Sequence, residues 1–295
     1  MSNDYIKNIG NFIPLTLSVV IDHSNWQQFV EGAIDELEEK IQLKYNTSEL
    51  FLGHDMGDPN QLYIFLYAPN AKKFYVARYI DQFLKDYLSR QNFPIIGKQR
   101  MDESLWMPYS ENTVKYGLFS ICDFSENDIV PIYSTLRRIN REIMNDSTFS
   151  YDILLLRSFA LTYLTAVHFE KYSPLVNVNE FLELLFNGES EPFEQFYKDE
   201  KELFLSVVEN LDKYGSITDM EWLHHWNVFL ETIVPLKQEK FTPKEAKEKF
   251  FEIISVVNGT NRLPTVERIA LVVAIRLALR DYKSLGYHFQ ESLSI

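Results

Sequence analysis

The sequence contains a single cysteine, Cys122, among its 295 residues. One thiol excludes an internal disulfide framework and a zinc site built from several cysteines, and it is typical of a reducing compartment. We therefore expect a cytoplasmic protein. No cation stands beside Cys122 in the sequence, so we interpret it as a small buried apolar residue rather than a reactive thiol.

Long apolar runs are also absent. A membrane-spanning helix needs about 18 consecutive apolar residues, and the nearest approach, residues 154–167, is interrupted by Arg157 and several hydroxyl side chains. This segment predicts a buried helix instead. The first ten residues contain Asp4 and lack a basic stretch followed by an apolar core, so they do not predict a secretion signal.

Basic residues are outnumbered by acidic ones. The chain has 29 lysines and arginines against 42 aspartates and glutamates, which gives a net charge of −13. This charge repels phosphate backbones and anionic lipids, so we expect neither nucleic-acid nor membrane partners. Apolar side chains, in contrast, make up 46% of the sequence, and aromatic ones 15%. That content is sufficient for a large buried core.

Several common motifs are missing. The sequence has no GxxxxGK followed by Ser or Thr, no GxGxxG after a strand and no GxSxG, which argues against the usual phosphate cradles and nucleophile elbow. His224 and His225 are adjacent, and neighbouring helical residues point about 100° apart, which disfavours one shared metal. With Trp222 and Trp226 beside them, we expect a packed aromatic helix face. No metal or cofactor site is predicted.

The N-terminal part reads as strands mixed with helices. Alternating apolar residues predict a strand over 14–21, and an apolar stripe predicts a helix from there to about Tyr45. Residues 61–68 and 73–77 predict an antiparallel hairpin joined by four residues, since so short a link cannot make a parallel crossover. A helix is expected over 80–90, followed by short extended pieces as far as residue 117.

From about residue 125 the apolar spacing becomes helical. Thr242, Pro243 and Glu245 form a helix start with a capping box. The sequence therefore predicts an α+β fold in one unit: a mixed or antiparallel sheet within about 1–124, packed against a helix-rich part over about 125–295. The expected helices are near 126–145, 151–172, 177–187, 193–214, 219–234, 243–257 and 265–283.

Three segments, in this order, resemble one family. Residues 62–79, LYIFLYAPNAKKFYVARY, resemble paired strands written roughly FIRYxDPxxHLRLR, in which Tyr67 keeps the aromatic residue. Residues 109–118, YSENTVKYGL, resemble YxPExxRYGG, and Trp106 stands where that family often has a tryptophan. Residues 255–267, SVVNGTNRLPTVE, resemble SxxHMxxNRLxxxxxE at the start of a last long helix. The family is the C-terminal elimination domain of lanthipeptide dehydratases, with its stand-alone thiopeptide relatives.

The departures from the family's pattern indicate one branch of it. Glutamate elimination in the family depends on arginines and a histidine at these motifs. Here Lys115 replaces one arginine, and Tyr75 and Ala77 replace strand arginines. Val257 or Asn258, depending on the alignment, replaces the histidine. The resemblance therefore implies a thiopeptide pyridine synthase, which joins two dehydroalanines of a modified peptide by a formal aza-(4+2) cycloaddition and releases water and the leader peptide.

The resemblance also implies roles for individual residues. Tyr116 would donate or accept protons, with Lys115 as electrostatic support. Glu267 would be a general acid or base, or else stabilise the positive end of its helix. We expect Lys115, Tyr116 and residues 258–262 to meet at one cavity; His168, His224 and His225 stay open as alternatives. The residues expected to bind the peptide are Tyr75, Trp106, Tyr109, Asn258, Asn261 and Arg262.

The implied partner is a ribosomally made precursor peptide, with other biosynthetic enzymes beside it, and the implied reaction needs no metal or cofactor. We expect the leader to bind on the strand-rich part, away from the proton-transfer residues. Two alternatives stay open. The chain could be a dehydroalanine-forming eliminase that uses Lys115 in place of arginine, or a non-catalytic subunit that presents the precursor along a sheet edge.

Overall fold

The computed structural model describes residues 12–54, 61–91, 93, 100–102, 107–109, 113–116, 129–145, 151–172, 176–188, 191–214, 221–233, 241–261 and 265–284. The chain divides into two compact units, Met1–Phe149 with Thr260–Arg262, and Ser150–Gly259 with Leu263–Ile295. All the described strands lie in the first unit. The predicted α+β fold, with a strand-rich N-terminal part and a helix-rich C-terminal part, is confirmed. The expectation of one undivided unit stays a prediction.

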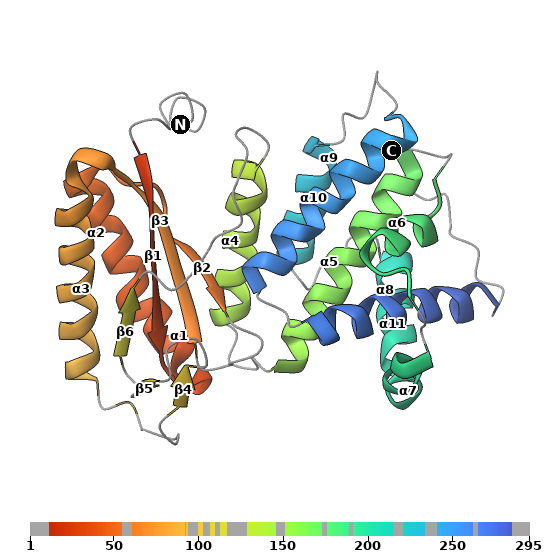
Figure 1. Ribbon diagram of the computed structural model, residues 1–295, viewed down its shortest axis with the longest axis horizontal. Helices are drawn as coiled ribbons and strands as arrows, with labels where there is room; N and C mark the ends of the chain where they lie inside the picture. Colours follow the sequence, from red (N-terminus) through yellow and green to blue (C-terminus); the bar gives the residue numbers. More distant parts are fainter. Residues whose placement is uncertain are drawn as a thin grey trace. The chain divides into compact units, whose positions relative to one another are not determined.

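Four strands of the first unit form an antiparallel sheet in the order β2-β3-β1-β6 (Figure 1). Leu17 of the central strand β1 lies opposite Ile64 on one side and Tyr116 on the other. A separate antiparallel pair is formed by β4 and β5. The strands are β1 (Phe12–Val20), β2 (Phe51–His54), β3 (Gln61–Pro69), β4 (Arg100–Asp102), β5 (Met107–Tyr109) and β6 (Thr113–Tyr116).

Residues 73–77 are not a strand, which corrects the predicted hairpin. They begin α3 (Lys73–Arg90), and β3 pairs with β1 and β2 instead. The alternation seen in the sequence covers only five residues, whereas the helical period of residues 80–90 extends back into this stretch. Helical packing therefore decides the conformation. The buried aliphatic residues of α3 recur every four positions, at Val76, Ile80, Leu84 and Leu88.

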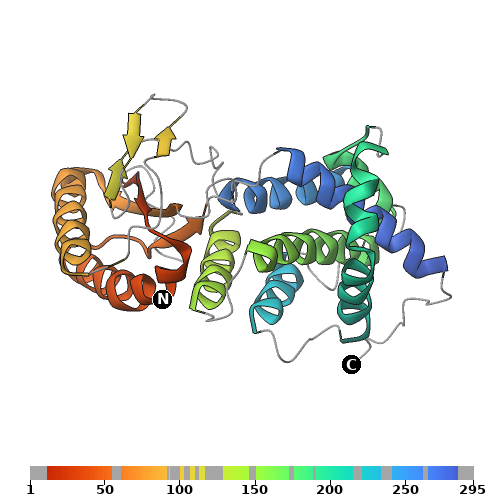
Figure 2. The same cartoon turned by 90° about the horizontal axis from the view of Figure 1, so that it is seen from below.

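Helices of the same unit cover one face of the sheet. As predicted, a helical segment runs to Tyr45: α1 (Trp26–Phe29), the π-helical turn η3 (Val30–Ile34) and α2 (Asp35–Tyr45). Figures 1 and 2 show α2 beside α3 on this face. The core between helices and sheet is largely aliphatic and includes Trp26, Phe29, Leu37, Ile64 and Leu84.

The π-helical turn lies where Tyr87 of α3 approaches Gly32. The Tyr87 hydroxyl donates a hydrogen bond to the backbone oxygen of Gln28 at 3.1 Å. A Cβ at position 32 would clash with that hydroxyl, so glycine permits the close approach of the two helices. Single π-helical turns of this kind interrupt α-helices where local packing requires them.

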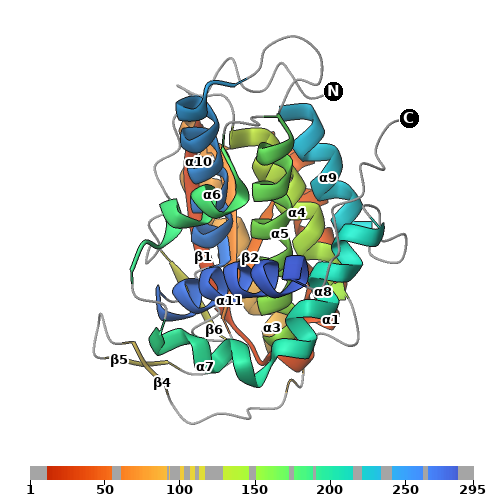
Figure 3. The ribbon, with the colours of Figure 1, turned by 90° about the vertical axis from the view of Figure 1, so that its right-hand side faces the viewer.

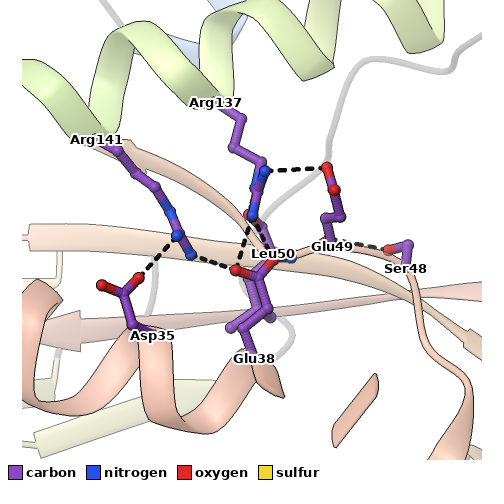
Figure 4. A network of polar contacts seen from close by, with 7 residues as sticks. All are labelled: Asp35, Glu38, Ser48, Glu49, Leu50, Arg137 and Arg141. Atoms are coloured by element: carbon purple, nitrogen blue, oxygen red, sulfur yellow. Dashed lines mark hydrogen bonds and ion pairs between the residues drawn. The ribbon is translucent and has the colours of Figure 1, made fainter. Parts of the chain in front are cut away.

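The helix α4 (Ile129–Asn145) is joined to α2 by two arginines (Figure 4). Nη2 of Arg137 donates to both carboxylate oxygens of Glu38, at 2.8 and 2.7 Å, and Nη2 of Arg141 donates to one of them at 2.5 Å. Arg141 also pairs with Asp35 at 2.7 Å. The Glu38 side chain is only 9% exposed. Because a buried carboxylate is costly without its partners, this contact holds α4 in place.

The same helix covers the outer edge of β2. Nε of Arg137 donates to the backbone oxygen of Leu50 at 2.9 Å, and Nδ2 of Asn140 donates to that of Leu52 at 2.5 Å. An open strand edge is a template for pairing with another chain. Since α4 occupies the backbone oxygen of Leu52 in β2 and that of Leu50 just before it, addition of a peptide strand at β2 is disfavoured.

In its described segments the second unit is helical. Figure 3 shows α11 crossing α5 and α8, and α5 contacts α6, α8, α9 and α11, which confirms that residues 154–167 lie in a packed helix. None of the described helices is long and apolar enough to span a membrane. The helices are α5 (Tyr151–Tyr172), α6 (Val178–Leu185), α7 (Glu191–Asp199), α8 (Lys201–Tyr214), α9 (Glu221–Ile233), α10 (Pro243–Asn261) and α11 (Thr265–Ser284).

Two local predictions in this unit have different outcomes. The capping box at the start of α10 is confirmed: the Thr242 amide donates to Glu245 Oε2 at 2.9 Å, and the Glu245 amide donates to Thr242 Oγ1 at 3.3 Å. The single helix expected over 193–214 is wrong, because the chain turns at Glu200. Asp281 of α11 bridges the break, since its Oδ2 accepts from Tyr197 of α7 and from Lys201 of α8 and so contacts helices on both sides of the turn.

His168 of α5 makes the stability of the protein depend on pH. Burial, with a smaller contribution from Lys171, lowers the pKa of His168 to about 4, against a hydrogen bond to the Leu230 backbone that acts in the opposite direction. In the unfolded chain its pKa is about 6.5, so between these values the unfolded state binds more protons. The free energy of unfolding should fall by about 2 kcal/mol from pH 7 to pH 5 on this account. Urea titrations at both pH values, with His168→Gln as control, measure it; an equal fall in the variant would contradict the assignment.

Candidate functional site

The predicted site residues lie in several elements. Lys115 and Tyr116 are on β6, in register with Ser18 and Leu17 of β1. Tyr109 is the last residue of β5, and Asn261 is the last of α10. For these four the structure describes the backbone only, and Trp106 and Arg262 lie outside the described residues. The predicted shared cavity stays a prediction.

Tyr75 is found on a helix rather than on a strand. It lies in the first turn of α3, and its side chain is 68% exposed. The strand context that suggested it as a peptide-binding residue is therefore wrong. An exposed aromatic residue on a helix can still contact a peptide.

The third family-like segment spans the end of α10 and the start of α11. Val257 is fully buried in the second unit, whereas Asn258, the next residue, is partly exposed. Adjacent helical side chains point about 100° apart. Position 258 is thus the one of the two that can reach a ligand, and Asn258 is the better counterpart of the family's histidine.

Glu267 lies in the first turn of α11, as the segment predicted. Its Oε2 is buried and accepts no hydrogen bond in the described part of the chain. A buried polar atom without a partner costs about 1–3 kcal/mol. The start of a helix favours a carboxylate electrostatically, but this alone does not satisfy the oxygen. The geometry fits an acceptor that is kept ready for a ligand.

Arg268 is a candidate residue that the motif comparison missed. Its Nη2 donates to Thr265 Oγ1 at 2.8 Å, while its Nε is buried without a hydrogen-bond partner among the described residues. Glu267 thus offers an open acceptor and Arg268 an open donor, and because adjacent helical side chains point about 100° apart, each would meet a different group. The only signal in the sequence was a basic residue directly after the glutamate.

A second region of interest is the face of the sheet opposite α2 and α3. Leu62, Ile64 and Leu66 of β3 belong to the core under the helices, and side chains alternate along a strand. The other face therefore carries aromatic rings, with Phe65 and Tyr67 packed edge to face at 5.0 Å. Gln61 Nε2 also donates there to Ser18 Oγ at 3.0 Å. The aromatic residues of this face are Phe51, Tyr63, Phe65 and Tyr67.

Tyr67 places a phenol on this face. Burial raises the pKa of the Tyr67 phenol above its usual value, which makes it a weaker acid than an exposed tyrosine, although its hydroxyl can still donate a hydrogen bond. The strand β6, with Lys115 and Tyr116, belongs to the same sheet. The signal was present in the sequence, because QLYIFLYA alternates aliphatic and aromatic residues from Leu62 onward.

His224 and His225 are neighbours on α9, with ring centroids 6.2 Å apart and planes tilted by 46°. Trp226, beside them, is fully buried and stacks near Phe229 with centroids 4.8 Å apart. Among the described residues, no three His, Cys, Asp or Glu side chains gather as a metal site requires. Leu223, Trp226, Phe229 and Leu230 form the buried face of α9, whereas His224 is exposed.

Comparisons with solved structures define the fold. The chain is similar to the pyridine synthase TbtD from thiomuracin biosynthesis, with TM-score 0.55 and 12% identity over 92% of this chain and 99% of that chain. It is also similar to TsrL, with TM-score 0.59 and 11% identity over 92% of this chain and 96% of that chain. No family model and no curated protein matches the sequence.

A third similar structure is the tRNA-dependent lantibiotic dehydratase MibB from Microbispora sp. 107891. The TM-score is 0.51 and the identity 11%, over 93% of this chain but only 28% of that chain. This chain therefore has the fold of a stand-alone pyridine synthase, which is also the fold of a part of a lantibiotic dehydratase. The resemblance predicted from the three motifs is confirmed at the level of the fold.

Proposed function

We propose that this protein is an enzyme of ribosomal peptide natural-product biosynthesis, and specifically a pyridine synthase that closes the macrocycle of a thiopeptide. The observation that carries the proposal is the extent of the fold match, over 92% of this chain and 99% of TbtD. The match to MibB supports the broader class of peptide natural-product enzymes, because a part of that much longer dehydratase, 28% of its length, has the same fold. The replaced arginines and histidine favour ring formation over glutamate elimination.

The reaction joins two dehydroalanines of one precursor peptide. An amide next to one dehydroalanine tautomerises to its imidate, and two carbon–carbon bonds then form to give a six-membered nitrogen ring. Water leaves, the leader peptide leaves as an amide, and the ring becomes a pyridine. Holding two distant alkenes together removes an entropic barrier, so positioning alone supplies much of the rate. The steps that remain are proton transfers.

The described residues suit these steps. Glu267 accepts a proton during tautomerisation or donates one to the departing amide. Arg268 and Asn258 hold peptide carbonyls, which accept hydrogen bonds. Tyr116 remains the neutral proton donor that the family resemblance implies. Neutral donors can assist the loss of water. They do not provide the charge that a glutamate eliminase needs to stabilise its leaving carboxylate.

Incubation with a dehydrated, azole-bearing precursor peptide tests the proposal. We expect mass spectrometry to find a macrocycle and a leader amide, and we expect a peptide without its leader to react much more slowly. A glutamylated peptide that loses glutamate without ring closure would instead identify an eliminase. Tight leader binding with no change in mass would identify a recognition subunit.

A further inference from the structure

The start of α3 is a basic region in an acidic protein. Residues 59–80 contain no aspartate or glutamate, although the whole chain carries a net charge of −13. The three charged residues in this stretch are Lys72, Lys73 and Arg78. A local excess of positive charge on such a chain attracts acidic partners, while the negative net charge keeps the whole protein from binding polyanions nonspecifically.

These cations are not neutralised by the described part of the chain, where none of the three forms a salt bridge. Further along α3 the arrangement differs, since Lys85 pairs with Asp81 at 2.8 Å. Lys72 is the N-cap of α3 and Lys73 its first residue, with no side-chain cap and no acidic residue in the first turn. The N-terminus of a helix carries partial positive charge. The positive charges of Lys72 and Lys73 repel this partial charge, and an acidic group bound beside them would weaken the repulsion.

Two large aromatic residues stand among the cations. Phe74 is 78% exposed and Tyr75 is 68% exposed. Residues three and four apart are neighbours on a helix surface, so Arg78 lies beside both rings. Lys73 Nζ lies 5.2 Å from the centre of the Phe74 ring. Exposed aromatic residues next to arginine are the composition that protein interfaces favour.

We propose that Lys72, Lys73, Phe74, Tyr75 and Arg78, the α3 start surface, bind an acidic peptide segment that carries apolar side chains. The charge selects acidic residues, and the two rings provide apolar anchors. If the function proposed above is correct, this segment is the leader of the precursor peptide; that identification rests on the proposed function. The surface belongs to the first, strand-rich unit, whereas Glu267 belongs to the second. Tethering there raises the effective concentration of the reacting core.

Fluorescence anisotropy with synthetic peptides tests the surface directly. The probes are labelled peptides of about 20 residues with leucines at helical spacing, whose remaining positions carry glutamate, glutamine or lysine. We expect the glutamate peptide to bind at least about tenfold more tightly than the glutamine peptide, and the lysine peptide not to bind. The preference should weaken with salt. Equal affinity for the glutamate and glutamine peptides, or no binding of either, would overturn the proposal.

Variants locate the binding. Lys72→Glu with Arg78→Glu, and separately Phe74→Ala with Tyr75→Ala, should each weaken binding of the glutamate peptide at least about tenfold. All four positions are exposed, and alanine favours helix, so circular dichroism should be unchanged. The charge control is Lys244→Glu with Lys198→Glu, both exposed lysines of the second unit. Loss of binding in the control pair, or full binding in the α3 variants, would refute the assignment.

The test separates this proposal from the proposed function, because it measures no turnover. If the α3 variants lose peptide binding but the wild type forms no macrocycle, the proposed surface is supported and the proposed pyridine synthase activity is refuted. In a separate kinetic measurement, unchanged kcat/KM for a leader-bearing substrate in the α3 variants would remove the leader as the occupant of the surface and keep the enzyme. Sedimentation velocity tests whether a second copy of this chain occupies the surface instead. Self-association of the wild type that is abolished by Lys72→Glu with Arg78→Glu would overturn the peptide as partner.

Discussion

Replacement of Glu38 by glutamine should lower the free energy of unfolding by about 3 kcal/mol. The Glu38 carboxylate is buried between the guanidinium groups of Arg137 and Arg141, and it also accepts a hydrogen bond from the Leu50 amide at 2.6 Å. Glutamine keeps the size of the side chain but removes the charge. Two largely buried arginines then lose their main partner, which is the costly way to break such a contact. Urea unfolding followed by tryptophan fluorescence measures the change.

Glu49→Gln is the matched control, because Glu49 pairs with the same Arg137 at 3.0 Å but is 58% exposed. Exposed ion pairs contribute about 0–1 kcal/mol, so this variant should stay within that range of the wild type. If the two variants lose equal stability, the buried contact is not what holds α4. Equal losses would also show that burial does not determine how much each carboxylate contributes to stability.

Replacement of Glu267 by glutamine should reduce turnover by at least about 100-fold, the usual contribution of a general acid or base. Stability should change by no more than about 1 kcal/mol, since Oε2 has no hydrogen bond to lose and the interaction of the charge with the helix start is weak. Binding of the leader should not change. Steady-state kinetics by mass spectrometry, with thermal unfolding in parallel, separates these readouts.

The control is Glu248→Gln, an exposed carboxylate on α10 that pairs with Lys244 at 3.7 Å. Its turnover should equal that of the wild type. A loss of stability in Glu267→Gln that matches the loss of activity would assign Glu267 to the helix start rather than to catalysis. Unchanged turnover would remove it from the site.

Helices were predictable from the sequence where a single local pattern, such as a capping box or a helical apolar period, was present without a competing one. Thr242 and Glu245 form the expected capping box, and the helical periods of the second unit gave its helices. Residues 73–77 misled because five alternating residues are too short to compete with a helix whose buried stripe begins at Val76. The break at Glu200 is bridged by Asp281, about 80 residues away in sequence, and no local pattern contains that contact.

The position of Glu267 at the start of a helix was predictable, but the surroundings of the candidate residues were not. The segment 255–267 placed Glu267 at the start of the last helix. It could not choose between Val257 and Asn258, because that choice depends on which side of α10 faces the core. The motif comparison matched Tyr67 only as an aromatic residue of the strand pattern, although the alternation of β3 already separates an aromatic face from an aliphatic one. Arg268 lacked any motif, and its role depends on an unpaired buried nitrogen that only coordinates reveal.

The most direct measurement of the central claim is the mass balance of one reaction. The wild-type protein is incubated with its dehydrated, azole-bearing precursor, and both products are quantified by high-resolution mass spectrometry. The account predicts equal amounts of a pyridine-containing macrocycle and a leader peptide ending in an amide, with one water lost for each ring. Precursor recovered at full mass, although it binds to the protein, would contradict it.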